Sequence, residues 1–385
     1  MPKAATKSVP ASKPQPYLEV RLTSVRAALG EYKIDALLLT HPGDLAYLSD
    51  FSGEDSVGVL TQDSFTLVTD FRYTEQAAIE CPWLGVKLRE GKMSEALCEV
   101  LRSLKAKRVG FESGFTTYAT VHTLIAALDE AATKAREKFR PAFVPLDNVM
   151  VGLRKIKDAH EIAILRQSVK VAEAAFTTLK SLIRPGQTEN HLAGQLVFEL
   201  RSRGASDSSF PVIIAAGANS SLPHYRPQNV KVANNSPLLI DWGALYNGYC
   251  SDLTRTLAVG KAAAKFKEIY GIVLEAQLAA LDFLRPGVTT FDADAVARDH
   301  ITQAGYGEQF GHSLGHGIGR DIHEQPSLRK TGTSEPLEAG MVVTVEPGIY
   351  LPGVGGVRIE DDVLITETGC EILSSLSKKL KDNTI

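Results

Sequence analysis

The sequence has no long apolar run, no closely paired cysteines and no large excess of one charge. No apolar stretch approaches the roughly 18 residues that a membrane-spanning helix needs, so we expect no membrane partner. The net charge is only −3, which gives no field to attract a polyanion and argues against nucleic acid as a partner. The four cysteines are scattered without a CxxC pair, as is usual for reduced thiols, and this predicts a cytoplasmic location.

The amino-terminal residues also lack an apolar segment. Residues 1–16 are rich in Pro, Ala, Ser and Lys, which is typical of a flexible tail and not of a secretion signal. Helical and strand patterns then alternate over 17–150, which predicts one α/β domain, and no nucleotide-binding fingerprint occurs in it. The composition shifts near 148–157, and 151–385 is expected to form a second, α+β domain.

The second domain contains an internal repeat. Its first stretch reads as one long helix that begins near Leu153 and is stopped by Pro185 and Gly186. The tripeptide Arg-Pro-Gly at 184–186 recurs at 285–287, and Gly204 recurs as Gly305, so both offsets are 101 (285 − 184 and 305 − 204). Each helical segment is followed by a predicted hairpin, at 237–258 and at 341–367. Because the matches keep their order and spacing, we expect duplicated α-α-β-β halves related by a pseudo-twofold axis.

Each predicted hairpin carries two carboxylates. Asp241 closes the apolar strand PLLID and Glu346 lies in VVTVEP, and an ionised carboxylate that faces a core costs several kcal/mol unless it is paired or binds a metal. Asp252 and Glu360 occupy comparable places on the return strands. Taken alone, Asp252 could pair with Arg255 at the surface, and Glu360 in RIEDD could belong to a solvated face. Four carboxylates that converge would repel one another, and divalent cations would resolve that conflict.

Histidines complete the candidate site. His316 in GHGIG is the expected imidazole ligand beside the four carboxylates, and a mostly oxygen donor set favours Mn²⁺, Fe²⁺ or Co²⁺ over a thiolate-type zinc site. Two such metals would generate a nucleophile from water at neutral pH. His224, His312 and His323 remain, and imidazoles near a metal can hold a carbonyl oxygen or give a proton to a leaving amine. For His312, support of the site and contact with substrate stay equally open.

The motifs match a known family in order. LIDWG, SDLTRT, GHGIG, IHE, TVEPGIY and GVRIED make 152–374 resemble the pita-bread metallopeptidases, which include aminopeptidase P, prolidase and methionine aminopeptidase. The preceding α/β domain resembles the creatinase-like amino-terminal domain of aminopeptidase P, prolidase and creatinase. Methionine aminopeptidases lack that domain, so the resemblance favours the proline-specific branch. It implies a pita-bread fold for 151–385 and a homodimer.

The resemblance also implies roles for individual residues. It implies that Asp252 and Glu360 bridge two metals, that Glu346 serves as a general base as well as a ligand, and that Arg358 braces the site. The implied metal ligands are Asp241, Asp252, His316, Glu346 and Glu360. The implied residues of the catalytic pocket are His224, His312, His323, Glu346 and Arg358.

The activity implied by the resemblance is hydrolysis of an amino-terminal Xaa-Pro bond. The expected partners are peptides with proline at the second position, and the expected cofactors are two divalent ions, Mn²⁺ first, with Co²⁺, Fe²⁺ or Zn²⁺ as alternatives. Two positions depart from the prolidase-like pattern: Arg320 stands where an apolar residue is usual, and Ser327 where an arginine is common. In dipeptidases an arginine in this region can hold the free carboxylate, so its absence favours an aminopeptidase. An Xaa-Pro dipeptidase, another small-amide hydrolase and a non-catalytic binding module are the alternatives.

Overall fold

The chain folds into two compact units. The computed structural model describes residues 13–385, so residues 1–12, most of the predicted tail, lie outside the described residues. One unit extends to Arg154 and the other comprises Lys155–Ile385. Among residues 13–385, none of the helices combines the length and the apolar composition that crossing a bilayer requires.

The first unit is built on a mixed sheet with strand order β4-β3-β2-β1-β5-β6, in which β2 alone runs antiparallel to its neighbours. Alternate residues of the buried strand β1 point to opposite faces. Leu37 and Leu39 pack with helices α1 and α2, whereas Ala36 and Leu38 pack with α4 and α5. The elements are α1 (Pro16–Glu31), β1 (Ala36–Leu39), α2 (Pro42–Ser49), β2 (Val57–Leu60), β3 (Phe65–Thr69), α3 (Thr74–Glu80), β4 (Gly85–Leu88), α4 (Met93–Leu104), β5 (Arg108–Glu112), α5 (Tyr118–Ala135), β6 (Ala142–Leu146) and α6 (Val149–Lys155). The unit is therefore an α/β layered domain, as predicted.

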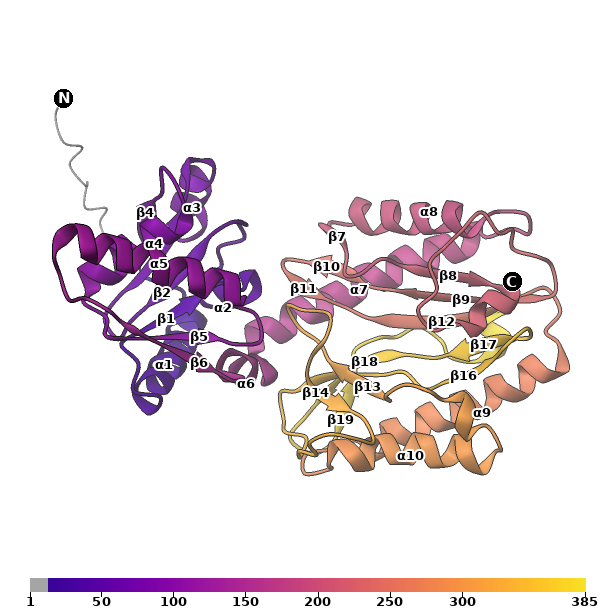
Figure 1. The fold of residues 1–385 in the computed structure, drawn as a ribbon. Helices are drawn as coiled ribbons and strands as arrows, with labels where there is room; N and C mark the ends of the chain where they lie inside the picture. Colours follow the sequence, from indigo (N-terminus) through magenta and orange to yellow (C-terminus); the bar gives the residue numbers. More distant parts are fainter. Residues whose placement is uncertain (1–12) are drawn as a thin grey trace. The chain divides into compact units, whose positions relative to one another are not determined.

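The second unit consists of two similar halves. In each half a helix pair precedes antiparallel strands, and Figure 1 shows α7 and α8 along one side of the strands and α9 and α10 along the opposite side. The first half contains α7 (Ala159–Leu182), α8 (Glu189–Ser202), β7 (Asp207–Ser208), β8 (Ile213–Ala216), β9 (Ser236–Trp242), β10 (Ala244–Tyr246), β11 (Tyr249–Cys250) and β12 (Leu253–Val259). The second half contains α9 (Ala264–Phe283), α10 (Thr290–Gln303), β13 (Gly315–Gly317), β14 (Glu324–Leu328), β15 (Val342–Val345), β16 (Gly348–Leu351), β17 (Gly355–Arg358), β18 (Asp361–Ile365) and β19 (Cys370–Ile372). The predicted fold class, with duplicated halves, is confirmed.

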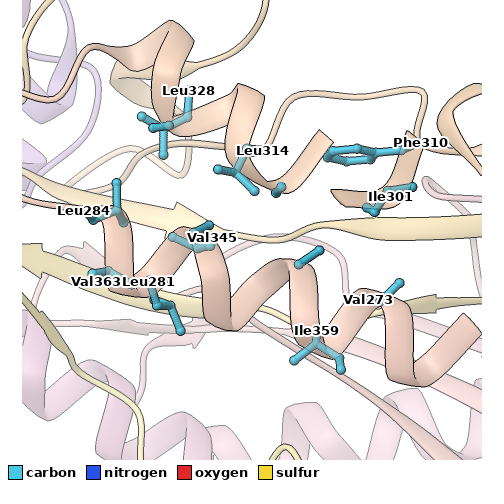
Figure 2. Packing of buried hydrophobic residues seen from close by; sticks show 14 of the residues in the cluster. Val273, Leu281, Leu284, Ile301, Phe310, Leu314, Leu328, Val345, Ile359 and Val363 are labelled. Carbon is cyan, nitrogen blue, oxygen red and sulfur yellow. The ribbon is translucent and has the colours of Figure 1, made fainter. Parts of the chain in front are cut away.

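Each half has its own core between helices and sheet. In the second half, Val273 and Leu281 of α9 pack in one cluster with Val345 of β15 and Val363 of β18, as Figure 2 shows. The corresponding cluster of the first half joins α7 and α8 to β8, β9 and β12. Each helix pair therefore covers mainly the strands of its own half.

The predicted single helix from Leu153 to Pro185 is wrong. The chain leaves helix α6 at Lys155, and α7 begins afresh after Asp158. The Asp158 carboxylate accepts a hydrogen bond from the Glu161 amide at 2.9 Å, and the Glu161 carboxylate accepts one from the Asp158 amide at 3.2 Å. This capping box supplies partners for amide groups that the first turn of a helix leaves unsatisfied, so a second helix starts here.

A buried ion pair joins β12 of the first half to β18 of the second half. Arg255 of β12 donates to Asp361 of β18 at 2.7 Å, and neither side chain is exposed to solvent. Arg255 also donates to the Glu360 carbonyl at 2.6 Å, and Asp361 accepts from Gln277 and Lys378 at 2.7 Å each. The alternative in which Arg255 pairs with Asp252 at the surface is therefore wrong, because Arg255 is fully buried and forms its ion pair with Asp361.

We expect Asp361→Ala to destabilise the protein by about 3–5 kcal/mol, because the substitution leaves the Arg255 charge buried without its partner. Denaturant unfolding followed by circular dichroism would measure the change. The matched control is Glu371→Gln, which removes a half-exposed carboxylate paired with Arg166 and should cost less than about 1 kcal/mol. Equal losses in the two variants would contradict the special importance of the buried pair.

Candidate metal centre

The four predicted carboxylates stand at the strand ends where the two halves meet. Asp241 lies in β9 opposite Thr254 of β12, and Asp252 directly precedes β12. Glu346 directly follows β15, and Glu360 links β17 to β18. The amide of Glu360 donates to the Thr254 carbonyl at 3.2 Å, a bridge that connects the two hairpins. Strand pairing therefore brings carboxylates together that are more than one hundred residues apart in sequence.

Three of the predicted ligands form a compact group. One ligand atom each from Asp252, His316 and Glu360 lies within 4.8 Å of the other two. The His316 Nε2 atom is 3.6 Å from an Asp252 oxygen and 3.7 Å from a Glu346 oxygen. The imidazole of β13 thus faces carboxylates of both halves.

The ring of His316 is oriented as a metal ligand requires. Its Nδ1 atom lies 2.9 Å from the Gly317 carbonyl oxygen, and since a carbonyl only accepts, Nδ1 carries the proton. Burial lowers the pKa of His316 to about 4, so the ring is neutral near pH 7. The lone pair of Nε2 is consequently directed towards the carboxylates, and a carbonyl partner on the other nitrogen is usual for metal-bound histidines.

The carboxylates repel one another in a buried setting. Burial, followed by the charges of Glu360 and Asp241, raises the pKa of Asp252 well above its usual range. Burial and the neighbouring Glu346 likewise raise the pKa of Glu360, and burial raises the pKa of Glu346 to about 8. The expectation that Glu360 might lie on a solvated face is wrong, since its side chain is almost fully buried. A cluster of this kind gains stability when a cation neutralises it.

Asp241 is only half satisfied. Arg358 donates to its Oδ2 atom at 2.5 Å, whereas Oδ1 is buried and has no hydrogen-bond partner among residues 13–385. A buried carboxylate oxygen without a donor is costly, and a divalent cation would supply what it lacks. The orphaned oxygen, the neutral imidazole of His316 and the crowded carboxylates together fit a site for hard divalent cations.

Arg358 connects Asp241 to a predicted pocket histidine. Its Nη1 donates to the Tyr350 hydroxyl at 2.8 Å and its Nε to Thr254 Oγ1 at 3.1 Å. Burial raises the pKa of Tyr350 to about 12, so the phenol keeps its proton and donates to His312 Nε2 at 2.8 Å. His312 Nδ1 in turn donates to the Ser313 carbonyl at 2.8 Å. Both ring nitrogens of His312 are thus engaged.

The other two pocket histidines are more exposed. His323 packs edge-on against His316, with ring centroids 4.3 Å apart. His224 is exposed and lies near enough to Asp241, His312 and His323 to influence the pKa of each. The three histidines therefore lie around the carboxylate cluster, two of them open to solvent.

Sequence analysis missed three residues of this site. Tyr350 lies inside the motif TVEPGIY, four positions after Glu346, and this closeness in the chain could have indicated that it belongs to the site. Its contacts with Arg358 and His312 could not be read from the motif. Thr254 donates to Glu360 Oε2 at 2.6 Å, and Asp362 accepts from the Asp252 amide at 3.0 Å. Both occur in motifs already singled out, SDLTRT and RIEDD, yet nothing in either pattern indicates the pairing across the two halves.

Two family models match the chain. The model of metallopeptidase family M24 matches 163–367, which contains every predicted site residue, and the model of the Creatinase/Prolidase N-terminal domain matches 21–156.

Sequence and structure comparisons agree with these matches. An Xaa-Pro dipeptidase of Pyrococcus furiosus is 35% identical, with 94% of this chain and 100% of the relative covered. Among solved structures, an Xaa-Pro dipeptidase from Bacillus anthracis is 40% identical with a TM-score of 0.88, and the match covers 96% of this chain and 100% of that chain. An X-Pro aminopeptidase from Thermotoga maritima MSB8 is 36% identical with a TM-score of 0.83, covering 92% and 98%. The two activities therefore occur among similar proteins.

Proposed function

This chain belongs to metallopeptidase family M24, and from that membership we propose that it is an Xaa-Pro aminopeptidase, which removes the first residue from peptides with proline in second place. The observation that carries the proposal is the buried group of Asp252, His316 and Glu360, with Glu346 beside it. The named relatives, which act on Xaa-Pro bonds, support the choice of substrate.

The proposed ligands of two divalent cations are Asp241, Asp252, His316, Glu346 and Glu360. We expect Mn²⁺ first, with Co²⁺, Fe²⁺ or Zn²⁺ as alternatives, because four carboxylates and one imidazole form a mostly hard donor set. When bound, such metals supply a nucleophile from water and polarise the scissile carbonyl.

The protein side chains would move the proton and hold the carbonyl. Glu346 would accept a proton from the attacking water at a carboxylate oxygen and pass it to the leaving nitrogen. His224 or His323 would donate to the oxygen that becomes negative in the tetrahedral intermediate, since both are open to the site. His312 would contact the substrate through its ring surface, because both of its nitrogens already have partners.

The preference for longer peptides rests on Ser327. Ser327 of β14 is the register partner of His316 of β13, so its side chain lies on the same face as the imidazole. A serine at this position carries no charge for the carboxylate of a dipeptide. An Xaa-Pro dipeptidase is the alternative, favoured by the activities of the two dipeptidase relatives. A non-catalytic binding module is disfavoured by the complete donor set.

The deciding test is cleavage of two peptides followed by mass spectrometry. Metal-stripped protein resupplied with Mn²⁺ is expected to release the first residue of an Xaa-Pro-Pro peptide and to cleave an Xaa-Pro dipeptide more slowly. Ser327→Arg should shift the ratio of kcat/KM towards the dipeptide by about 10- to 150-fold, because a charge-assisted hydrogen bond is worth about 1.5–3 kcal/mol. Preference of the unaltered protein for the dipeptide would show a dipeptidase instead. Cleavage of neither peptide despite Mn²⁺ binding would refute the proline specificity.

We also propose a homodimer, on the resemblance alone. Light scattering after size-exclusion chromatography would give the mass, and a strict monomer would refute it. The cytoplasmic location likewise stays a prediction.

A further inference from the structure

The buried carboxylate of Glu189, at the start of α8, accepts all its side-chain hydrogen bonds from one loop. Glu189 is fully buried, and within 13–385 no cationic side chain forms an ion pair with it. Its Oε1 atom accepts from the Ala216 amide at 2.8 Å and from Asn219 Nδ2 at 2.9 Å. Its Oε2 atom accepts from the Tyr225 hydroxyl at 2.8 Å and from the Gln228 amide at 3.1 Å.

All four donors belong to the segment 216–228, which carries His224. Two donors precede His224 in the chain and two follow it, and Tyr225 is its immediate neighbour. Burial and the hydrogen bond to Glu189 raise the pKa of Tyr225 to about 12, so this donor keeps its proton. Because the His224 side chain itself is exposed, packing of the imidazole cannot hold the segment. The four hydrogen bonds to Glu189 fix it, together with the one that Ser220 accepts from the Gly356 amide at 2.8 Å.

A second buried carboxylate holds the loop of His312. Asp294 of α10 is fully buried and accepts from the Leu314 amide at 3.0 Å. It also orients Arg298, which donates to Asp294 at 2.6 and 2.7 Å. Arg298 in turn donates to the carbonyl of Phe310 at 2.9 Å and to that of His312 at 2.7 Å. The segment 310–314 is thus fixed at three backbone points.

The two arrangements occupy corresponding helices of the duplicated halves. Adding the repeat offset of 101 to position 189 gives 290, and Asp294 lies about one helical turn further along α10. A buried carboxylate is stable only while its donors stay in place, so each helix and its loop become ordered together. Glu189 holds its loop by direct hydrogen bonds alone, whereas Asp294 holds its loop by one direct hydrogen bond and through Arg298. Each of the two loops carries a pocket histidine.

We propose that Glu189 and Asp294 are positioning residues, each of which fixes the loop that carries one substrate-facing histidine, His224 and His312 respectively. The catalytic part of this inference rests on the proposed function. Displacement of a contacting group by about 1 Å can lower a rate by about 100-fold, so small movements of either loop would matter.

The kinetic test uses isosteric substitutions. In Glu189→Gln one carboxylate oxygen, which accepts hydrogen bonds, becomes an amide NH₂ group, which can only donate. Its two donor partners are then left without an acceptor, and Asp294→Asn has the same effect. Each variant is expected to lose about 10- to 100-fold in kcat/KM for an Xaa-Pro-Pro peptide while binding Mn²⁺ like the unaltered protein. The matched controls are Glu199→Gln on α8, which faces Arg203, and the exposed Asp299→Asn on α10; both should stay within about twofold. Losses of equal size in variant and control would overturn the proposal.

A double-mutant cycle separates positioning from general damage. In a His224→Ala background, Glu189→Gln should cost less than about threefold, because the group it positions is already absent. In a His312→Ala background the same substitution should keep its full effect. Asp294→Asn should show the reverse pattern. Additive losses in all four combinations would overturn the proposal, since they would mean that each carboxylate acts independently of its histidine.

Hydrogen–deuterium exchange gives a readout that does not need activity. Glu189→Gln should increase exchange in 216–228 and leave 310–314 unchanged, and Asp294→Asn should do the opposite. Increased exchange in both segments, or in neither, would overturn the positioning roles. If the unaltered protein cleaves no Xaa-Pro peptide but the crossed exchange pattern is found, the proposed function fails while the two loop anchors stand.

Discussion

Glu346→Gln is expected to lower kcat/KM by about 10²–10⁴-fold, the range found when a general base is removed. Glu346 directly follows β15. Its carboxylate oxygens lie 3.7 Å from His316 Nε2 and 4.0 Å from His312 Nδ1, so it is central to the proposed site. An amide of the same shape cannot take a proton from water. Steady-state kinetics on an Xaa-Pro-Pro peptide with Mn²⁺ in excess would measure the loss.

Because Glu346 is also a proposed ligand, the metal content of the variant has to be measured in the same samples. Glu338→Gln serves as the control, since Glu338 is an exposed carboxylate just before the same hairpin and its loss should change the rate less than twofold. A Glu346→Gln protein with full activity and full metal content would refute the proposed proton transfer. If the loss of activity is proportional to the loss of metal, Glu346 acts as a metal ligand and not as the general base.

Asp252→Asn is expected to make the metal-free protein more stable. Burial and the neighbouring carboxylates, Glu360 first among them, raise the pKa of Asp252. A neutral amide at this position therefore removes a repulsion that destabilises the folded, metal-free protein. We expect a gain on the order of 1–3 kcal/mol in the free energy of unfolding at neutral pH. For a protein of this size that corresponds to a rise in Tm of roughly 1–4 °C.

The same substitution should abolish the response to metal. Addition of Mn²⁺ at 100 times its Kd should stabilise the unaltered protein by about 2.7 kcal/mol, whereas Asp252→Asn should gain little. Thermal unfolding with chelator and with Mn²⁺ would measure both effects. The control is Asp282→Asn, an exposed carboxylate on α9 whose loss should change neither curve. A metal-free Asp252→Asn protein that melts below the unaltered metal-free protein would contradict the repulsion argument.

The two-half architecture of the second unit was predictable because repeated local sequence patterns indicate it. The repeat offset of 101 indicated two halves, and a charged residue at the end of an apolar strand indicated Asp241 and Glu346 as buried carboxylates. The break before α7 was also readable, since Asp158 and Glu161 have the spacing of a capping box. The apolar periodicity of the long segment masked that signal.

The contacts between the halves were not predictable from local patterns. A run of charges such as RIEDD is usually solvated, yet Glu360 and Asp361 are buried because partners arrive from β12, more than one hundred residues earlier. The bonds of Tyr350 to Arg358 and His312 depend on how β16, β17 and the preceding loop converge. Pairings of this kind are set by tertiary packing, between the halves for Glu360 and Asp361 and within the second half for Tyr350, which no single stretch of sequence encodes.

The division of the proposed ligands between the halves gives the metal a mechanical role. Asp241 and Asp252 come from the first half, and His316, Glu346 and Glu360 come from the second. A cation held by both sets would act as a staple that closes a long stretch of chain, with 64 positions separating Asp252 from His316 (316 − 252). Separation of the halves would then release the metal, whereas the metal-free protein stays folded through contacts such as the Arg255–Asp361 pair. Unfolding of the metal-loaded protein would therefore release its metal, and its activity would be lost in the same step.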